Sequence, residues 1–298
     1  MREKMKVGFI GLGRMGKGMA LRLLNGGHDL AVYDVFTPAT EDFRSTSARI
    51  AGSVADLCRD REVVITMLAE DSAVQAVALG PEGMTKSLPS GAIHMASGTY
   101  GIDTIRALEA AHAQAGQTLI AVPVLGRPDL AASGQLGMIP AGPDEALKRC
   151  EPLFQLLARR VFYGGMKPES ASAMKLANNA VLGCAITAMA EGFSLVRKHG
   201  VHPQVLYDVM TDGLFAGGIA YIGYGKTMVE GTYDRVGSPI TIGMKDAQLI
   251  AAAASLARVP MPSHDVYIQR LLGAIAHGDA NLDQAALVRE QARASGLE

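Results

Sequence analysis

Short apolar runs alternate with helix-like patterns over the first 120 residues of the chain. The runs occupy residues 7–10, 30–33, 63–68 and 92–95, with a weaker one at 118–122. Alternation of short strands with helices predicts an α/β domain built on a doubly wound, mostly parallel sheet. Ligands of such sheets lie at the carboxyl ends of the strands. The residues that follow each run are therefore the first candidates for a binding site.

The pattern changes at Gly164-Gly165, where the strands nearly end. Before this point, residues 134–142 are expected to form a strand that closes the sheet, 144–157 a helix and 160–163 a short strand. After it, residues 170–198 form one helical pattern that is apolar on most faces, and shorter helices are expected at 203–211, 215–229, 243–258, 261–277 and 282–293. A helix apolar nearly all round is buried on nearly all sides. We therefore expect an all-helical second domain built on one long helix that also makes a subunit contact, with domains of residues 1–165 and 166–298.

A glycine motif lies directly between the first strand and the first helix. Gly11, Gly13 and Gly16 form a G-x-G-x-x-G run, with Leu12, Arg14 and Met15 at the intervening positions. The glycines make the turn, admit a pyrophosphate and pack helix on strand, and the helix N-terminus attracts phosphate. Asp34 ends the second strand, 23 residues after Gly11, where an acid binds ribose hydroxyls. The context favours a Rossmann-type dinucleotide site over a purely structural turn.

Composition limits the class of protein. The chain has 298 residues, 49% of them hydrophobic, and a net charge of −1 without charged blocks, which argues against a nucleic-acid partner. Its three cysteines lack metal or disulfide spacing and fit a reduced cytoplasmic protein. No signal peptide is recognisable, and no apolar stretch is expected to span a membrane. The histidines form no ligand set, so we expect no metal site.

Further candidates follow from position along the chain. Leu68, Ala69 and Ser97 each come after a predicted strand and are either cofactor neighbours or ordinary loop residues. Lys175 and Asn179 lie on one face of the long helix. A lysine at the mouth of a cleft between the domains exchanges a proton with an oxygen during hydride transfer. The alternative is a solvated lysine on an exposed helix face.

Two other cations are ambiguous from the sequence alone. Arg127 ends a turn-rich loop after a strand, where it either clamps a carboxylate or phosphate or is an ordinary surface arginine. Lys245 precedes Asp246 near the expected start of a helix, where the acid would favour the N-terminus. Lys245 itself would then face either the cleft or solvent.

Taken in order, these motifs resemble the β-hydroxyacid dehydrogenases, the group of 3-hydroxyisobutyrate dehydrogenase, tartronate semialdehyde reductase and the N-terminal part of 6-phosphogluconate dehydrogenase. The resemblance covers nearly the whole chain through four segments: residues 8–16, 65–69, 175–179 and 245–246. It implies a cofactor site at Gly11–Gly16, Leu68, Ala69, Ser97 and Lys245. It also implies that Lys175 is the general acid/base and that Asn179 helps to bind substrate.

One segment departs from the resemblance. The family's substrate loop reads Asp-x-Pro-Val-Ser-Gly-Gly, whereas residues 121–127 read Ala-Val-Pro-Val-Leu-Gly-Arg. Leu125 replaces a serine that holds a carboxylate, Gly126 is kept, and Arg127 replaces a glycine. A lost hydrogen bond to a buried partner costs about 1–3 kcal/mol. Either Arg127 supplies the carboxylate contact, or the substrate is less polar.

The resemblance and the residues together predict an NAD(P)-dependent oxidoreductase that transfers a hydride between nicotinamide and a small hydroxyacid or semialdehyde. Asp34, with no arginine directly after it, predicts NAD over NADP. The expected assembly is a homodimer or homotetramer. Two alternatives stay open: an imine (C=N) reductase-like enzyme for a less polar substrate, which a retained Lys175 disfavours, and a non-catalytic cofactor-binding protein, which Leu125 favours.

Overall fold

A computed structural model describes residues 4–212 and 216–297. The packing of the chain divides it into a first unit that ends at Lys175 and a second that begins at Leu176. This division falls inside the long helix α8 (Pro168–Lys198), whose first two turns belong to the first unit. Each unit has its own hydrophobic core, and the two are described separately below.

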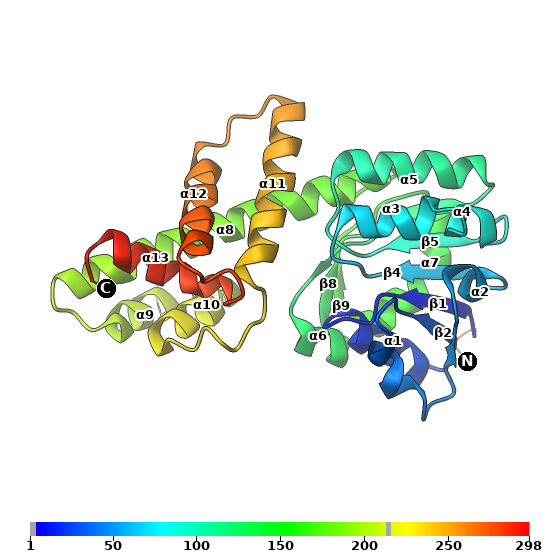
Figure 1. The fold of residues 1–298 in the computed structure, drawn as a ribbon, viewed down its shortest axis with the longest axis horizontal. Helices are drawn as coiled ribbons and strands as arrows, with labels where there is room; N and C mark the ends of the chain where they lie inside the picture. Colours follow the sequence, from blue (N-terminus) through cyan, green and yellow to red (C-terminus); the bar gives the residue numbers. More distant parts are fainter. Residues whose placement is uncertain (1–3, 213–215, 298) are drawn as a thin grey trace. The chain divides into compact units, whose positions relative to one another are not determined.

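The first unit is built on a six-stranded parallel sheet with the order β3-β2-β1-β4-β5-β6 (Figure 1). The strands are β1 (Lys6–Ile10), β2 (Asp29–Tyr33), β3 (Arg49–Ile50), β4 (Val63–Thr66), β5 (Ile93–Ala96) and β6 (Thr118–Ala121). The five apolar runs correspond to β1, β2, β4, β5 and β6, so the predicted doubly wound sheet is confirmed. β3 was not predicted, because its two residues are exposed and carry no apolar pattern.

Helices cover both faces of this sheet. They are α1 (Gly16–Asn25), η1 (Thr37–Phe43), α2 (Val54–Cys58), α3 (Asp71–Leu79), α4 (Met84–Ser87), α5 (Ile102–Gln114), α6 (Pro128–Ser133) and α7 (Asp144–Leu157). Val63 and Ile65 of β4 join the core that includes residues of α1 and α7, whereas Val64 between them joins a core that includes residues of α2 and α4. Burial on both faces explains why the strands read as continuous apolar runs.

A second, three-stranded sheet follows β6 and corrects one expectation. It contains β7 (Val124–Leu125), β8 (Leu136–Met138) and β9 (Ala158–Val161) in the order β7-β8-β9. Residues 134–142 were expected to close the main sheet, and this prediction was wrong: β8 pairs with β7 and β9, and Ala141 reaches the main sheet through an isolated antiparallel bridge to Ala121. Pro123 and Pro140 flank this bridge and have no N–H to donate, so a continuous ladder cannot form there.

The second unit is helical, as predicted. After α8 it contains α9 (Pro203–Asp212), α10 (Ile219–Glu230), α11 (Ile240–Ala257), α12 (Pro262–Ala276), η2 (Gln284–Ala286) and α13 (Leu287–Ala294). The helix expected from residue 215 begins at Ile219 in the structure, and residue 215 lies outside the described residues. α11 begins three residues earlier than expected. Asp246 therefore lies in the second turn of α11, and the expectation that this acid favours the helix N-terminus was wrong.

The long helix is less buried than its sequence suggests. Phe193, Met189 and Ile186 are buried in the core of the second unit, but Val181 is 72% exposed and Met174 is 43% exposed. The prediction of burial on nearly all sides was therefore wrong for the chain by itself.

By length and composition α8 could also cross a membrane, contrary to the expectation from sequence. Half of its most apolar window is buried, and core helices of soluble proteins pass the same test.

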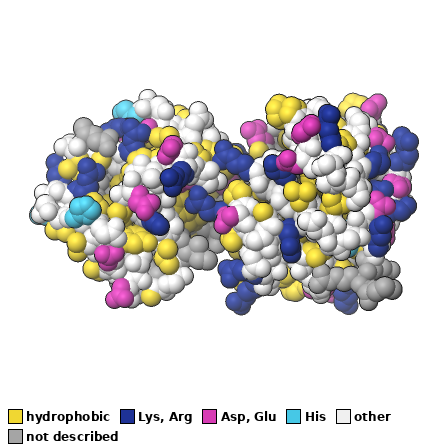
Figure 2. Space-filling view, turned by 90° about the horizontal axis from the view of Figure 1, so that it is seen from below, with side chains coloured by type: hydrophobic (Ala, Val, Ile, Leu, Met, Phe, Trp, Pro, Cys, Tyr) yellow, Lys and Arg dark blue, Asp and Glu magenta, His cyan; other side chains and the backbone are white. Residues whose placement is uncertain are grey.

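Charged side chains are mixed over the visible surface. Figure 2 shows Lys and Arg side chains interspersed with Asp and Glu on the face it presents. This distribution agrees with the net charge of −1. That face therefore lacks the extended basic stripe that phosphate backbones of nucleic acids require.

Candidate cofactor and catalytic site

In the turn after β1, each of the three glycines meets a different steric requirement. Gly11 has a φ of +96° and donates its N–H to the Tyr33 carbonyl oxygen at 3.1 Å. A Cβ at Gly16 would overlap the Gly11 carbonyl oxygen, so only glycine lets α1 begin this close to the strand. Gly13 differs, because a Cβ there would have no atom within 4 Å. The space beside Gly13 is open to a ligand, as a pyrophosphate site requires.

The start of α1 is suited to an anion. The N-cap residue Met15 makes no side-chain hydrogen bond to the helix, and no acidic residue lies in the first turn. The first N–H groups of the helix thus have no capping side chain and carry its partial positive charge. Leu12, Arg14 and Met15, all predicted cofactor neighbours, belong to this turn. The donors present fit the phosphates of a dinucleotide.

Asp34 ties the glycine turn to the end of β2. One carboxylate oxygen accepts the Leu12 N–H at 2.7 Å, and the other accepts the Phe36 N–H at 2.8 Å. The carboxylate also borders a hollow of about 330 Å³, which is lined by Tyr33, Asp34, Val35, Thr37, Thr40, Ile50, Ala51 and Gly52. The hollow and the acid together fit the adenosine end of a dinucleotide, as predicted for Asp34.

The loops after β4 and β5 carry the next predicted residues. Leu68 is half-buried and Ala69 is exposed. Ser97 is 1% exposed and donates its N–H to the Thr66 carbonyl oxygen at 2.9 Å, but its hydroxyl has no hydrogen-bond partner among the described residues. A buried hydroxyl without a partner is uncommon in a folded protein. The Ser97 hydroxyl therefore fits a group that a bound cofactor would satisfy.

Lys175 lies against the segment that was predicted to bind substrate. Its Nζ donates a hydrogen bond to the Val124 carbonyl oxygen at 2.9 Å. Val124 and Leu125 form β7, Gly126 follows with a φ of +141°, and Arg127 precedes α6 as its N-cap residue. The side chain of Leu125 packs partly against an apolar core of the first unit. The first unit thus brings Lys175 together with the predicted substrate loop.

The side chains of Asn179 and Lys245 both bind the carboxylate of Asp246 in the second unit. Asn179 donates its side-chain amide to one Asp246 oxygen at 2.7 Å, and the Lys245 ammonium lies 2.7 Å from the other oxygen. Asp246 is therefore the group that orients both predicted residues. From the sequence it was assigned only to a helix start, although its position directly after Lys245 in the resemblance was a usable signal.

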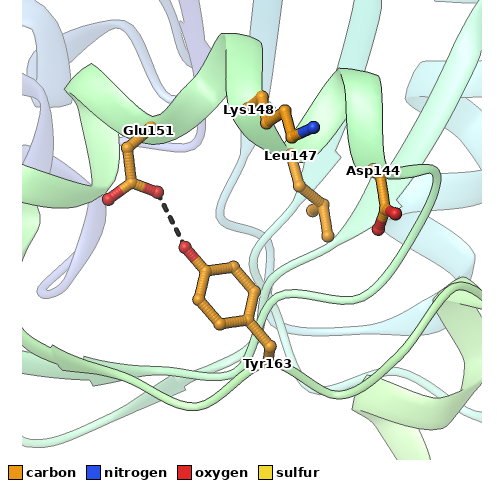
Figure 3. A pocket seen from close by; sticks show the side chains of 5 residues that line it. All are labelled: Asp144, Leu147, Lys148, Glu151 and Tyr163. Carbon is orange, nitrogen blue, oxygen red and sulfur yellow. Dashed lines mark hydrogen bonds between the residues drawn. The ribbon is translucent and has the colours of Figure 1, made fainter.

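Other polar groups of the first unit do not form a second reactive centre. A hollow of about 410 Å³ is lined by Asp144, Leu147, Lys148, Glu151 and Tyr163 (Figure 3). The Tyr163 hydroxyl donates to a Glu151 carboxylate oxygen at 2.7 Å, and this bond raises the pKa of Tyr163. The hollow includes none of the predicted site residues. Burial raises the pKa of the Cys58 and Cys150 thiols to about 12, so neither is a ready nucleophile. Within the described ranges no three metal-ligating side chains gather.

Known proteins resemble both parts of the chain. A family model of the NAD binding domain of 6-phosphogluconate dehydrogenase matches residues 6–165. A second model, described as NAD-binding of NADP-dependent 3-hydroxyisobutyrate dehydrogenase, matches residues 170–290. These two matches together cover the strands, the glycine turn and most of the helical second unit.

Individual relatives span most of the chain. The uncharacterized oxidoreductase YfjR of Bacillus subtilis is 34% identical over 96% of this chain and 99% of its own length. The 3-hydroxyisobutyrate dehydrogenase of Pseudomonas aeruginosa is 33% identical over 68% of each protein. The crystal structure of 3-hydroxyisobutyrate dehydrogenase from Salmonella typhimurium superposes with a TM-score of 0.84 at 24% identity, over 95% of this chain and 98% of that chain. This last likeness shows the shared fold.

The glycine turn generates a paired prediction. Gly13→Ala adds a methyl group to open space, so stability changes by less than about 0.5 kcal/mol, whereas the dissociation constant for NADH rises about tenfold or more because the methyl blocks close approach of the phosphates. Gly16→Ala forces a methyl group onto the Gly11 carbonyl and destabilises the fold by about 1–3 kcal/mol. Thermal denaturation and NADH fluorescence titration measure both effects. Unchanged NADH binding by Gly13→Ala would contradict the assignment.

Proposed function

The chain belongs to the 3-hydroxyisobutyrate dehydrogenase-like family of β-hydroxyacid dehydrogenases, and on that basis we propose that it interconverts a small hydroxyacid and its semialdehyde with Lys175 as the general acid/base. As a member, it is an NAD(P)-dependent dehydrogenase acting on CH–OH groups. The observation that carries the proposal is the contact of Lys175 with the main chain of the substrate loop at Val124.

Each of the candidate residues has a proposed role in this hydride transfer. A bound nicotinamide cofactor supplies or accepts the hydride; the glycine turn would hold its pyrophosphate, Asp34 its adenosine ribose and Ser97 its nicotinamide side. The Lys175 ammonium gives a proton to the substrate oxygen during reduction, and the neutral amine takes that proton during oxidation. The Val124 carbonyl accepts a hydrogen bond from Lys175 and so aims the Nζ atom without neutralising it.

We assign substrate recognition to Arg127 and the groups beside it. A guanidinium binds a carboxylate with two parallel hydrogen bonds, which would replace the bond of the serine that Leu125 has displaced. From the family resemblance we also assign Asn179, on the second unit, to substrate binding. Leu125 offers an apolar surface to the substrate carbon chain. This arrangement favours a hydroxyacid with an apolar substituent over a polyhydroxylated one.

A substrate screen tests this assignment. Small β-hydroxyacids, their semialdehydes, matched alcohols without a carboxylate and cyclic imines would each be assayed with both cofactors. We expect turnover of hydroxyacids, and we expect Arg127→Met to raise the KM for the acid about tenfold or more with kcat little changed, because a charged hydrogen bond is worth about 1.5–3 kcal/mol. Turnover of imines alone would favour a C=N reductase, and cofactor binding without any turnover a non-catalytic protein.

Removal of the lysine tests the catalytic role. Lys175→Ala is expected to lower kcat by about 10²- to 10⁴-fold, the usual contribution of a general acid/base, while the dissociation constant for NADH stays within about twofold. Lys148→Ala, which removes an exposed lysine on α7 of the same unit, is the matched control and should leave kcat unchanged. A variant at Lys175 with wild-type kcat would exclude this residue as the proton donor.

The Asp34 carboxylate supports a preference for NAD. It would accept bonds from ribose hydroxyls and repel a 2′-phosphate. Asp34→Asn removes the charge and keeps one oxygen that can accept the Leu12 N–H, while the exposed Phe36 N–H loses its acceptor to solvent. The ratio of initial rates with NADP and NAD should therefore rise about tenfold in the variant, equivalent to about 1.4 kcal/mol. Wild-type protein that prefers NADP clearly would contradict the assignment.

We also propose that the chain acts as a homodimer or homotetramer in the cytoplasm. Met174 and Val181 on α8 are 43% and 72% exposed, and apolar side chains left exposed on one helix support association when a second copy covers them as one patch. Three cysteines without disulfides support a reducing compartment. The molar mass from light scattering measures the assembly directly.

A further inference from the structure

Tyr100 is a buried tyrosine in the loop between β5 and α5 that the roles above do not use. It is 1% exposed, and its hydroxyl oxygen accepts the Leu68 N–H at 3.2 Å while the hydroxyl donates to the Leu68 carbonyl oxygen at 3.2 Å. One side chain thus holds both main-chain polar groups of a residue in the neighbouring loop. Burial raises the pKa of this hydroxyl, which keeps it protonated and able to donate.

The loop that contains Tyr100 is shaped around its ring. A Cβ at Gly98 would overlap the ring and hydroxyl of Tyr100 and would approach the Leu68 carbonyl oxygen. The absence of a side chain at Gly98 therefore admits the tyrosine. Gly98 directly follows Ser97, whose hydroxyl is buried without a partner among the described residues.

Leu68 in turn lies against the glycine turn. A Cβ at Gly11 would come within 3.0 Å of the Leu68 side chain and the Met67 main chain. Met67 donates its N–H to the Ile10 carbonyl oxygen at 2.9 Å. The β4–α3 loop thus contacts both Gly11 and Tyr100. A shift of Leu68 would therefore change the packing around Gly11 in the pyrophosphate turn.

A buried chain of hydrogen bonds lies at the start of the β4–α3 loop. It begins at Thr66, the last residue of β4, two residues before Leu68. Thr66 bonds to His94 Nε2 at 2.9 Å, His94 Nδ1 to His112 Nε2 at 2.8 Å, and His112 Nδ1 to Gln117 Oε1 at 2.7 Å. Burial lowers the pKa of both histidines, so both rings are neutral at pH 7.

The direction of this chain follows from its end. The Gln117 amide nitrogen donates to the Leu88 carbonyl oxygen at 2.6 Å, so its oxygen accepts the proton on His112 Nδ1. His112 Nε2 is then an acceptor for His94 Nδ1–H, and His94 Nε2 is an acceptor for the Thr66 hydroxyl. Thr66 therefore donates its proton to His94, which fixes the side chain at the end of β4, directly before the loop that Tyr100 holds.

We propose that Tyr100 is a positioning residue for the cofactor, which holds the main chain of Leu68 so that Leu68 and Ala69 line the dinucleotide site next to Gly11. The proposal rests on the cofactor site proposed above. Without the Tyr100 hydroxyl, the Leu68 N–H and carbonyl lose their hydrogen-bond partner and the loop is less ordered in the cofactor-free protein. Cofactor binding must then order the loop, and this weakens the affinity. The reaction chemistry at Lys175 is untouched.

Tyr100→Phe tests the proposal, because it keeps the ring and removes only the hydroxyl. We expect the dissociation constant for NADH, and the KM for the cofactor, to rise about tenfold, with kcat within about twofold of wild type. Hydrogen exchange of the Leu68 amide should be faster in the cofactor-free variant. Tyr233→Phe, which removes a hydroxyl bonded to the Met228 carbonyl in the second unit, is the matched control.

A second variant guards against a folding defect in the first. Gly98→Ala puts a methyl group where the Tyr100 ring and hydroxyl lie and so moves them away from Leu68 without removing the hydroxyl; it should raise the dissociation constant in the same direction. Wild-type NADH affinity in Tyr100→Phe, or an equal change in Tyr233→Phe, would overturn the positioning role and leave the proposed function standing. Wild-type protein that binds neither NADH nor NADPH would remove both.

Discussion

The close approach of the Gly16 main chain to the Gly11 carbonyl oxygen is the contact on which the cofactor site depends. It lets α1 begin directly above the end of β1, so that the first N–H groups of the helix and the open side of Gly13 face the same space. The Met67 main chain approaches Gly11 from the next strand, and Asp34 accepts the Leu12 N–H from the strand on the other side. Three strand ends are thereby drawn together around one turn that tolerates no side chain at two of its positions.

The sheet was predictable where burial is two-sided and not elsewhere. β1, β2, β4, β5 and β6 are covered on both faces and therefore read as apolar runs. β3 is exposed, and its pairing with β2 leaves no trace in its own sequence. Residues 134–142 have the composition of a strand, but Pro123 and Pro140 prevent a full ladder with β6. The apolar pattern of a segment indicates whether its side chains are buried. Which strand it pairs with depends also on where main-chain N–H groups are available to donate hydrogen bonds.

The site was predictable to the extent that its chemistry is local. The glycine turn and Asp34 follow from spacing along a single β–α–β segment, and Lys175 follows from the order of several motifs. Tyr100 and Asp246 were missed as organising residues because each acts through hydrogen bonds to residues distant in sequence: Tyr100 to Leu68, and Asp246 to Asn179. Neither periodicity nor composition distinguishes such a tyrosine or aspartate from any other.

The two kinds of predicted contact differ in how they constrain the chain. Cofactor contacts are built mostly from main-chain geometry: a glycine turn, a helix N-terminus and a loop held by Tyr100. Changes there alter the fold as well as binding, because the same atoms serve both. The proposed substrate contacts would come from side chains on β7 and the turn after it, where Leu125 and Arg127 follow Val124, whose carbonyl accepts the Lys175 hydrogen bond. A side chain can be exchanged at these positions while the hydrogen bond from Lys175 to the Val124 carbonyl persists, since that bond needs only the backbone. If Lys175 is the proton donor, as proposed, this loop can therefore change substrate preference without moving the lysine. The proposal thus links the departure of residues 121–127 from the family pattern to a changed substrate.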